Sequence, residues 1–221
     1  GYFSVRYRKG PAVMAERGRP RGFDRQVALR RAMEVFWEHG YEGASLSELT
    51  AAMGINAPSL YAAFSCKEAL FREAVTLYEQ QEGVLVAQAP TAREAVAGLL
   101  RSGAIAYTEP DKPAGCMIVL AATTYTPKTE AIRDHLRERR RAAKAAVRQR
   151  LEQGVADGDL APGLDTGALA DYLSTVLSGM SVQARDGVGR DGLLAVADAA
   201  MAGWDRLTSG EAGRSEPLAS R

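Results

Sequence analysis

The segment from residue 56 to residue 61, NAPSLY, carries side chains that could hydrogen-bond to the base edges and phosphates of DNA. Leu60 and Phe64 stand four residues apart, which marks the buried side of a short helix. Pro58 fits the first turn, where a missing amide N–H costs nothing. The opposite face then consists of small and hydrogen-bonding side chains, those of Asn56, Ala57, Ser59, Tyr61 and Ala63. This face predicts a helix that approaches DNA closely, and an ordinary helical hairpin is the alternative on spacing alone.

A second short helix is predicted just before it by its own start and stop signals. Ser45 and Glu48 have the spacing of a capping box, so a helix should begin near Leu46. Its apolar positions continue at helical spacing to Met53, which gives it one buried face. Gly54 then ends it, because glycine adopts the left-handed conformation that follows a helix without steric cost. The two helices and the turn between them predict a helix-turn-helix.

The flanking residues support this prediction. Residues 23–39 have the apolar pattern of an amphipathic helix that Gly40 ends, and this helix could pack against the other two. The arm before it carries Arg19 and Arg21, which could reach a minor groove or a phosphate, although a solvated tail is an equally good interpretation. Lys67 follows the second short helix, where its ammonium group could meet a phosphate.

Residues 27–75 resemble the N-terminal domain of the tetracycline-repressor (TetR/AcrR) family of bacterial transcriptional regulators. The residues that carry the resemblance are Ala32, Phe36, Gly40-Tyr41, Ser45, Leu49, Gly54, Leu60-Tyr61, Phe64 and Lys67-Glu68-Ala69-Leu70-Phe71. It implies an all-α repressor that binds palindromic operator DNA as a homodimer. It further implies three DNA-binding helices and a larger C-terminal domain that dimerises and binds a small-molecule effector, which releases the DNA. The DNA contacts that it implies are at Ser45, Asn56, Ala57, Pro58, Ser59, Tyr61 and Lys67.

One departure from the family pattern concerns Ala62 and Ala63. Many relatives carry an aromatic residue or His just before the Phe of the motif, whereas this chain has alanine at both positions. Because fewer long polar groups then reach the bases, we expect thymine methyl contacts and DNA shape to contribute more to specificity.

Composition and charge agree with a DNA-binding regulator. The chain has 221 residues, of which 46% are hydrophobic, and a net charge of only +1. Residues 1–67 hold ten Lys and Arg against six Asp and Glu, so the positive charge lies in the half with the DNA motif. Cys66 and Cys116 form no recognisable disulfide framework, and no apolar run of membrane-spanning length occurs. We therefore expect a cytoplasmic protein without a membrane partner.

The rest of the chain is predicted to be helical, with about nine helices in all. Beyond the DNA motif, helices are expected over residues 67–87, 91–107, 115–125, 127–158, 165–185 and 191–207. The predicted domains are a flexible arm at 1–22, a DNA-binding domain at 23–66, an effector-binding and dimerisation domain at 67–208 and a disordered tail at 209–221. Residues 1–13 precede Met14 and read as an expression remnant or an extended start.

The last two predicted helices are amphipathic, so two copies could form a four-helix dimer interface. Intramolecular packing is the alternative, and the family resemblance favours the dimer. The residues predicted for this interface are Leu169, Leu173, Leu177, Leu194, Ala197, Met201 and Trp204.

An effector cavity should be apolar with a few well-placed polar groups. The residues that suit this description are Tyr78, Tyr107, Cys116, Met117, Leu120, Thr124, Tyr125, Tyr172, Val176 and Met180. Among them the phenols of Tyr107, Tyr125 and Tyr172 are favoured, because a buried phenol needs a hydrogen-bond partner that a ligand can supply. Few charged residues are expected inside, which predicts a neutral or aromatic effector. The basic run at residues 137–150 is interpreted as a solvated helix face.

Enzyme sites find little support in the sequence. Residues 187–192 match the Gly-x-Gly-x-x-Gly pattern, but they follow a helix rather than a strand. Ser181 lacks the glycine that a nucleophile elbow requires, since Gln183 stands there. With His39 and His135 as the only histidines, we expect no catalytic residues, metal site or cofactor. The alternative function is a thiol sensor of oxidants or electrophiles that acts through Cys116.

Overall fold

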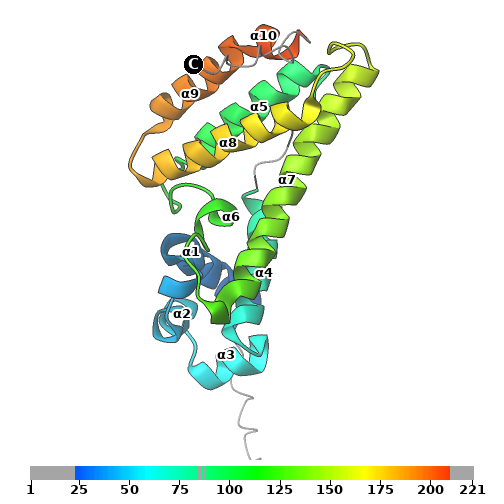
Figure 1. Ribbon diagram of the computed structural model, residues 1–221. Coiled ribbons are helices and arrows are strands. Elements are labelled where there is room, and N and C mark those ends of the chain that lie inside the picture. Colours follow the sequence, from blue (N-terminus) through cyan, green and yellow to red (C-terminus); the bar gives the residue numbers. More distant parts are fainter. Residues whose placement is uncertain (1–22, 84–85, 87, 210–221) are drawn as a thin grey trace, which may run out of the picture.

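The computed structural model describes residues 23–83, 86 and 88–209, and within these residues the protein is entirely helical (Figure 1). The α-helices are α1 (Arg25–Gly43), α2 (Leu46–Met53), α3 (Ala57–Phe64), α4 (Lys67–Gln81), α5 (Ala92–Ala106), α6 (Met117–Leu120), α7 (Glu130–Ala156), α8 (Thr166–Arg185), α9 (Arg190–Ala202) and α10 (Trp204–Thr208). A short 3-10 turn, η1 (Pro127–Thr129), precedes α7. The predicted all-α fold is therefore confirmed.

The helix-turn-helix forms as its start and stop signals predict. The Ser45 hydroxyl accepts a hydrogen bond from the Glu48 amide over 3.1 Å, and the Glu48 carboxylate accepts one from the Ser45 amide over 2.8 Å. Gly54 ends α2 with a φ of 69°, in the left-handed region. The Asn56 side chain caps α3 by accepting a hydrogen bond from the Ser59 amide. Each cap stabilises its helix by about 1 kcal/mol.

A first hydrophobic core joins α1, α2, α3 and the first part of α4. Phe36 packs edge-on against Phe71, with ring centroids 5.0 Å apart, and Tyr41 packs against the same Phe71 ring. Leu60 and Phe64 of α3 are buried in this core, as their spacing predicts. Residues of α6 and the start of α7 also belong to it, so the core extends beyond the helix-turn-helix itself.

A second core lies among α5, the last part of α7, α8, α9 and α10. Figure 1 shows α7 as the longest helix, running from the helix-turn-helix end of the molecule to the opposite end. Its residues Ile132 and Leu136 are buried in the first core, whereas Val147 and Leu151 are buried in the second. No helix within the described residues has both the length and the apolar character needed to cross a bilayer.

The predicted boundaries of three helices near the middle of the chain are wrong. Helix α4 ends at Gln81 rather than near residue 87. The backbone at Gly83 then passes so close to Glu79 that only glycine fits, because an added Cβ would lie 2.6 Å from the Glu79 carbonyl oxygen. Only Met117–Leu120 of the apolar run 115–125 is helical, because the Ala121 carbonyl accepts a hydrogen bond from the Tyr41 amide and the chain turns there. The long helix α7 begins at Glu130, after η1.

The chain ends in two helices where one was predicted, because Gly203 separates α9 from α10. The Gly203 amide donates to the Met201 carbonyl and does not continue the α-helical hydrogen-bond pattern. This break explains why the described residues contain ten α-helices rather than about nine. In α1 the predicted break at Gly40 is present, with a φ of 70°, but a further turn continues to Gly43.

Candidate functional site

The outer face of α3 is available for contact with another molecule. The Tyr61 side chain is 46% exposed, and Asn56, Ala57 and Pro58 are exposed as well. Ser59 is half-buried at the edge of the same face. These are the α3 residues predicted to contact DNA, and the fold brings them onto one surface beside α2. Small, uncharged side chains there allow the helix backbone to approach a groove closely.

The polar groups on this surface are partly held by the helix caps. The Asn56 Oδ1 atom accepts a hydrogen bond from the Ser59 amide over 2.9 Å, which leaves its Nδ2 group available as a donor. The Ser45 hydroxyl donates to Glu48 Oε2 over 2.7 Å while it caps α2. This hydrogen bond lowers the pKa of the Glu48 carboxyl group, which favours the ionised form that accepts the bonds of the cap.

Lys67 folds back onto the protein in this structure. Its Nζ atom lies 4.4 Å from the centroid of the Tyr41 ring, within the range of a cation–π contact. Burial lowers the pKa of Lys67, and the nearby carboxylates of Glu42 and Glu48 oppose that effect. In this position the Lys67 side chain is half-buried.

Arg25 is a residue of this region that sequence reasoning missed. Its Nη2 atom donates to Glu73 over 2.8 Å and to the Ala63 carbonyl over 3.3 Å, and its guanidinium lies 4.3 Å from the Phe64 ring centroid. Arg25 thus connects α1, the end of α3 and α4. Its partners are distant in sequence, so no local signal could have revealed this role. Arg19 and Arg21, predicted to contact DNA from the arm, lie outside the described residues.

A cavity of about 370 Å³ lies between α4, α5, α6, α7 and α8. Three of the ten predicted effector-binding residues line it: Tyr78, Tyr107 and Cys116. The other seven do not, namely Met117, Leu120, Thr124, Tyr125, Tyr172, Val176 and Met180. Met117 and Met180 are buried in the two cores. Tyr172 is exposed on the outer face of α8, and Tyr125 is exposed in the loop between α6 and η1.

Cys116 lies beside two buried phenols at the wall of this cavity. Burial raises the pKa of the Cys116 thiol, and hydrogen bonding to Tyr78 opposes this effect only in part. Burial likewise raises the pKa of Tyr78 and of Tyr107. The thiol is therefore protonated at neutral pH, which disfavours the thiol-sensor alternative, since a reactive cysteine needs its thiolate form.

Charged residues line the cavity on α7, contrary to the expectation of little internal charge. Arg139, Arg140 and Lys144 all contribute to its wall. They belong to the basic run that was interpreted as a solvated face. At 3.6 residues per turn, Arg140 and Lys144 share the side of α7 that carries Val147, which is buried. That side faces the cavity, so the interpretation as a fully solvated face is wrong for these residues.

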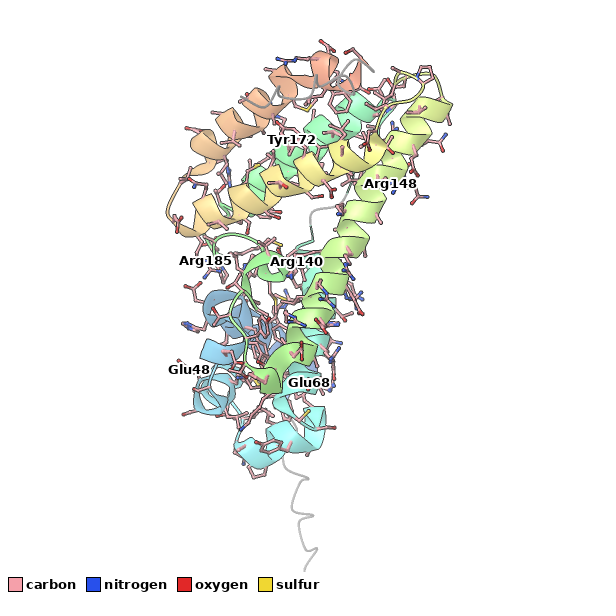
Figure 2. All side chains as sticks on the ribbon, viewed as in Figure 1. Glu48, Glu68, Arg140, Arg148, Tyr172 and Arg185 are labelled. Atoms are coloured by element: carbon pink, nitrogen blue, oxygen red, sulfur yellow. The ribbon has the colours of Figure 1, made fainter. Side chains whose placement is uncertain are left out.

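Hydrogen bonds connect the cavity wall to the DNA-binding end of the molecule. The Cys116 amide donates to the hydroxyl of Ser181 in α8 over 2.8 Å. The adjacent Gly115 carbonyl accepts a hydrogen bond from the indole of Trp37 in α1 over 3.0 Å. Arg185 of α8 donates to the Ala114 carbonyl and to two carbonyls near the end of α1. Figure 2 shows Arg185 at the end of α8 nearest to α1.

Four of the seven residues predicted for the dimer interface are buried within the chain itself. Leu169, Leu173, Ala197 and Trp204 belong to the second core and leave little area for a second copy. Leu177, Leu194 and Met201 are half-buried against the same core, because the strongest apolar positions of both helices face inward. Apart from Tyr172, the exposed faces carry smaller side chains, namely Thr175, Gly179 and Val182 on α8 and Ala195, Val196, Ala199 and Ala202 on α9.

A capped helix-turn-helix with an exposed α3 face, joined to helices that enclose a cavity, defines a DNA-binding regulator. Comparison with known families agrees: residues 28–74 match the model for bacterial regulatory proteins of the tetR family. Residues 91–187 match the C-terminal domain model described as tetracyclin repressor-like. The chain belongs to the tetR family and is a DNA-binding transcriptional regulator.

Characterised relatives are similar over most of the chain. The transcriptional repressor ComR of Escherichia coli is 36% identical over 200 residues, which cover 88% of this chain and 95% of ComR. The repressor BdcR of the same organism is 30% identical over 84% of this chain and 90% of its own. A cysteine-substituted CifR, a TetR family regulator solved with 26-bp operator DNA, is 52% identical, with a TM-score of 0.81. The similarity covers 84% of this chain and 98% of that one.

Proposed function

We propose that this protein represses transcription by binding a palindromic operator as a homodimer, and that a small molecule in the cavity releases it. The observation that carries the proposal is the exposed α3 face, where Asn56, Ser59 and Tyr61 lie together on a helix fixed at both ends. The operator complex of the similar CifR supports the same use of the fold. The protein acts by binding rather than by catalysis, and it works in the cytoplasm, where bacterial DNA is accessible.

In this proposal α3 enters the major groove of the DNA, and Lys67 and the start of α2 contact the DNA backbone. Asn56 and Tyr61 supply hydrogen-bonding groups to base edges or phosphates, while Ala57 and Pro58 allow close approach. Ser59 donates to a phosphate, and Ser45 does so once its hydroxyl proton turns away from Glu48. Arg19 and Arg21 reach a groove or the DNA backbone from the arm. Arg25 acts as a positioning residue that holds the end of α3.

Dimerisation follows because one helix-turn-helix reads only one half-site, and two-fold symmetry supplies the second. We assign the dimer interface to the exposed small-residue faces of α8 and α9 rather than to the buried leucines. An added Cβ at Gly179 would meet no atom within 4 Å, so this position leaves room for a second helix. Small residues permit close approach of the four helices in the dimer.

Release requires that the effector favour a state in which the two recognition helices no longer match successive grooves. Two routes lead from the cavity to the DNA-binding end. Tyr78 and Glu79 lie on α4, which begins directly after the helix-turn-helix, and Cys116 is tied through the neighbouring residues 114 and 115 to α1. A ligand that moves α6 or α4 changes the orientation of the helices that bind DNA.

Binding of the purified protein to labelled DNA from upstream of its own gene tests the proposal. Fluorescence anisotropy should show sequence preference, and the affinity should fall as salt increases. Tyr61→Ala should weaken binding by about tenfold, since one good contact contributes about 1–3 kcal/mol. Tyr125→Ala removes another exposed tyrosine, in the loop between α6 and η1, and is the matched control. The proposal is wrong if no upstream fragment is preferred over unrelated DNA.

A further inference from the structure

The charges around the cavity do not balance among the residues that the structure describes. Arg139 pairs with Glu79, whose carboxylate lies 3.4 Å from it, and Lys144 pairs with Asp171. Arg140 is the remaining cation of the wall, and it pairs with no carboxylate of the described chain. The cavity therefore has an unpaired positive charge at the place where α7 faces α6.

Arg140 is fixed in position but not fully used as a donor. Its Nη1 atom donates to the Ile118 carbonyl of α6 over 2.7 Å. Its Nε and Nη2 groups donate to no other described residue, and these two groups form the edge of a guanidinium that binds a carboxylate in parallel. Figure 2 shows Arg140 on the part of α7 that lies beside α6.

Partial burial makes this charge costly without an anion. Removal of water from around Arg140 lowers its pKa, and no described carboxylate offsets the effect. Burying a cation is unfavourable unless a counter-charge and hydrogen bonds replace the lost water. A ligand that carries its own negative charge would recover this free energy on binding.

The rest of the wall suits an apolar body. Leu99, Val119, Val147 and Leu177 line the cavity together with alanines of α7. The volume of about 370 Å³ corresponds to roughly twelve water-sized volumes, so a ligand of about a dozen non-hydrogen atoms fits. The phenols of Tyr78 and Tyr107 supply further hydrogen-bond donors on the wall.

We infer that the effector is an organic monoanion, a carboxylate on an apolar body of about a dozen non-hydrogen atoms, and that Arg140 binds its carboxylate. This inference rests on the proposed effector site and replaces the neutral ligand expected from the sequence. Arg140 is then the residue that determines specificity, because it distinguishes an acid from a neutral compound of the same shape.

The test uses a pair of ligands that differ in charge and little else, 4-phenylbutyrate and 4-phenylbutanamide. Isothermal titration calorimetry on the full-length protein should show at least about tenfold tighter binding of the carboxylate, which corresponds to one charge-assisted hydrogen-bonded pair. Arg140→Gln should remove the preference and leave the amide affinity within about twofold. Arg148→Gln, at an exposed position of α7 paired with Glu152, should retain it.

Each other outcome has a defined meaning. Equal affinities for acid and amide, or a preference that persists in Arg140→Gln, would overturn the inference. If neither compound binds, in this pair or in shorter and longer homologues of both, the inference is also wrong. Failure of the proposed function looks different, because the protein would then show no preference for upstream DNA. Arg140→Lys keeps the charge, so it should retain part of the preference for the carboxylate. That result would show that the loss in Arg140→Gln does not come from a disrupted fold.

Discussion

The Nη2 atom of Arg185 donates a hydrogen bond to the Trp37 carbonyl over 2.8 Å, which joins the end of α8 to the end of α1. The same guanidinium donates to the Glu38 carbonyl over 2.8 Å and to the Ala114 carbonyl over 3.0 Å. Carbonyls near a helix end lack partners within the helix, and a cation there also interacts favourably with the helix dipole. Arg185 thus acts as a cap for α1 that comes from another part of the chain.

Replacing Arg185 by Met should destabilise the protein, because three carbonyl groups lose a charged donor. We expect a loss of about 2 kcal/mol in the free energy of unfolding, measured by urea denaturation. Amides near the end of α1 should also exchange faster with deuterium. Arg148→Met, at an exposed site with one carboxylate partner, should change neither quantity. Unchanged exchange at α1 in Arg185→Met would show that this contact does not couple the two helices.

Asn56→Ala should weaken DNA binding more than it weakens the fold. The substitution removes the cap of α3 and one donor on the DNA-facing surface, so we expect a stability loss of about 1 kcal/mol. Operator affinity should fall by at least about tenfold. Thr91→Ala removes an equivalent cap from α5 and should lower stability without this loss of affinity. Similar affinity losses in both variants would mean that only stability is affected.

Gly179→Arg should convert the dimer to a monomer. The side chain extends into open space in a single copy, so the monomer fold should persist, but it would collide with a second copy on the exposed face of α8. Size-exclusion chromatography with light scattering measures the change. Ala145→Arg, at an exposed position of α7, is the matched control. A dimer that survives Gly179→Arg would place the interface elsewhere.

The two cysteines should differ strongly in reactivity. Cys66 is exposed, whereas burial raises the pKa of Cys116 and keeps its thiol protonated. Iodoacetamide followed by mass spectrometry should therefore modify Cys66 first and Cys116 only slowly at pH 7. Cys116→Ser should leave the effect of a mild oxidant on DNA binding unchanged. Loss of an oxidant response in this variant would restore the thiol-sensor alternative.

Stability should decrease between pH 7 and pH 5.5 because of His135. Burial, together with the charges of Arg72 and Arg139, lowers the pKa of His135, and its Nε2 atom is buried without a hydrogen-bond partner among the described residues. The unfolded state therefore binds the proton more readily. The stabilisation that neutral His135 contributes to the folded state is complete above pH 6.5, the ordinary pKa of histidine. It is lost as the pH falls from that value toward the lowered pKa of the folded state, by at most about 1.4 kcal/mol per pH unit.

Urea denaturation at several pH values checks this prediction. His135→Leu should have a flatter pH dependence than the unchanged protein, since its side chain does not titrate. His39→Gln, which removes the exposed histidine, is the matched control. Equal slopes in all three proteins would exclude His135 as the cause.

Local signals explain which parts of this fold could be predicted from the sequence. The boundaries of α2 and α3 follow from Ser45, Gly54 and Asn56, whose effects act within a few residues. The short helix α6 could not be predicted, because its end depends on a hydrogen bond between Tyr41 and Ala121, eighty residues apart. Periodicity identifies a buried face but does not tell a core position from a dimer position, and four of the seven residues predicted for the interface are buried within the chain itself.

The residues that line the cavity could likewise be predicted only in part from the sequence. Tyr78, Tyr107 and Cys116 could be chosen by residue type, whereas Arg140 could not, because basic residues on a polar helix are usually solvated. Only the position of α6 against α7 shows that this guanidinium faces inward. The role of Arg185 likewise depends on three carbonyls from two distant segments.

The long helix α7 has a further consequence for how this protein could change over evolution. It is buried at one end with the helix-turn-helix and at the other with α5 and α8, and its 27 residues correspond to a rod of about 40 Å. A chimaera joined at residue 67 would bring in a foreign α4 and a foreign α7, whose buried side chains must both fit the core formed with α1. The sensing half is therefore not an exchangeable module, and a new specificity is reached more readily by substitutions within the cavity.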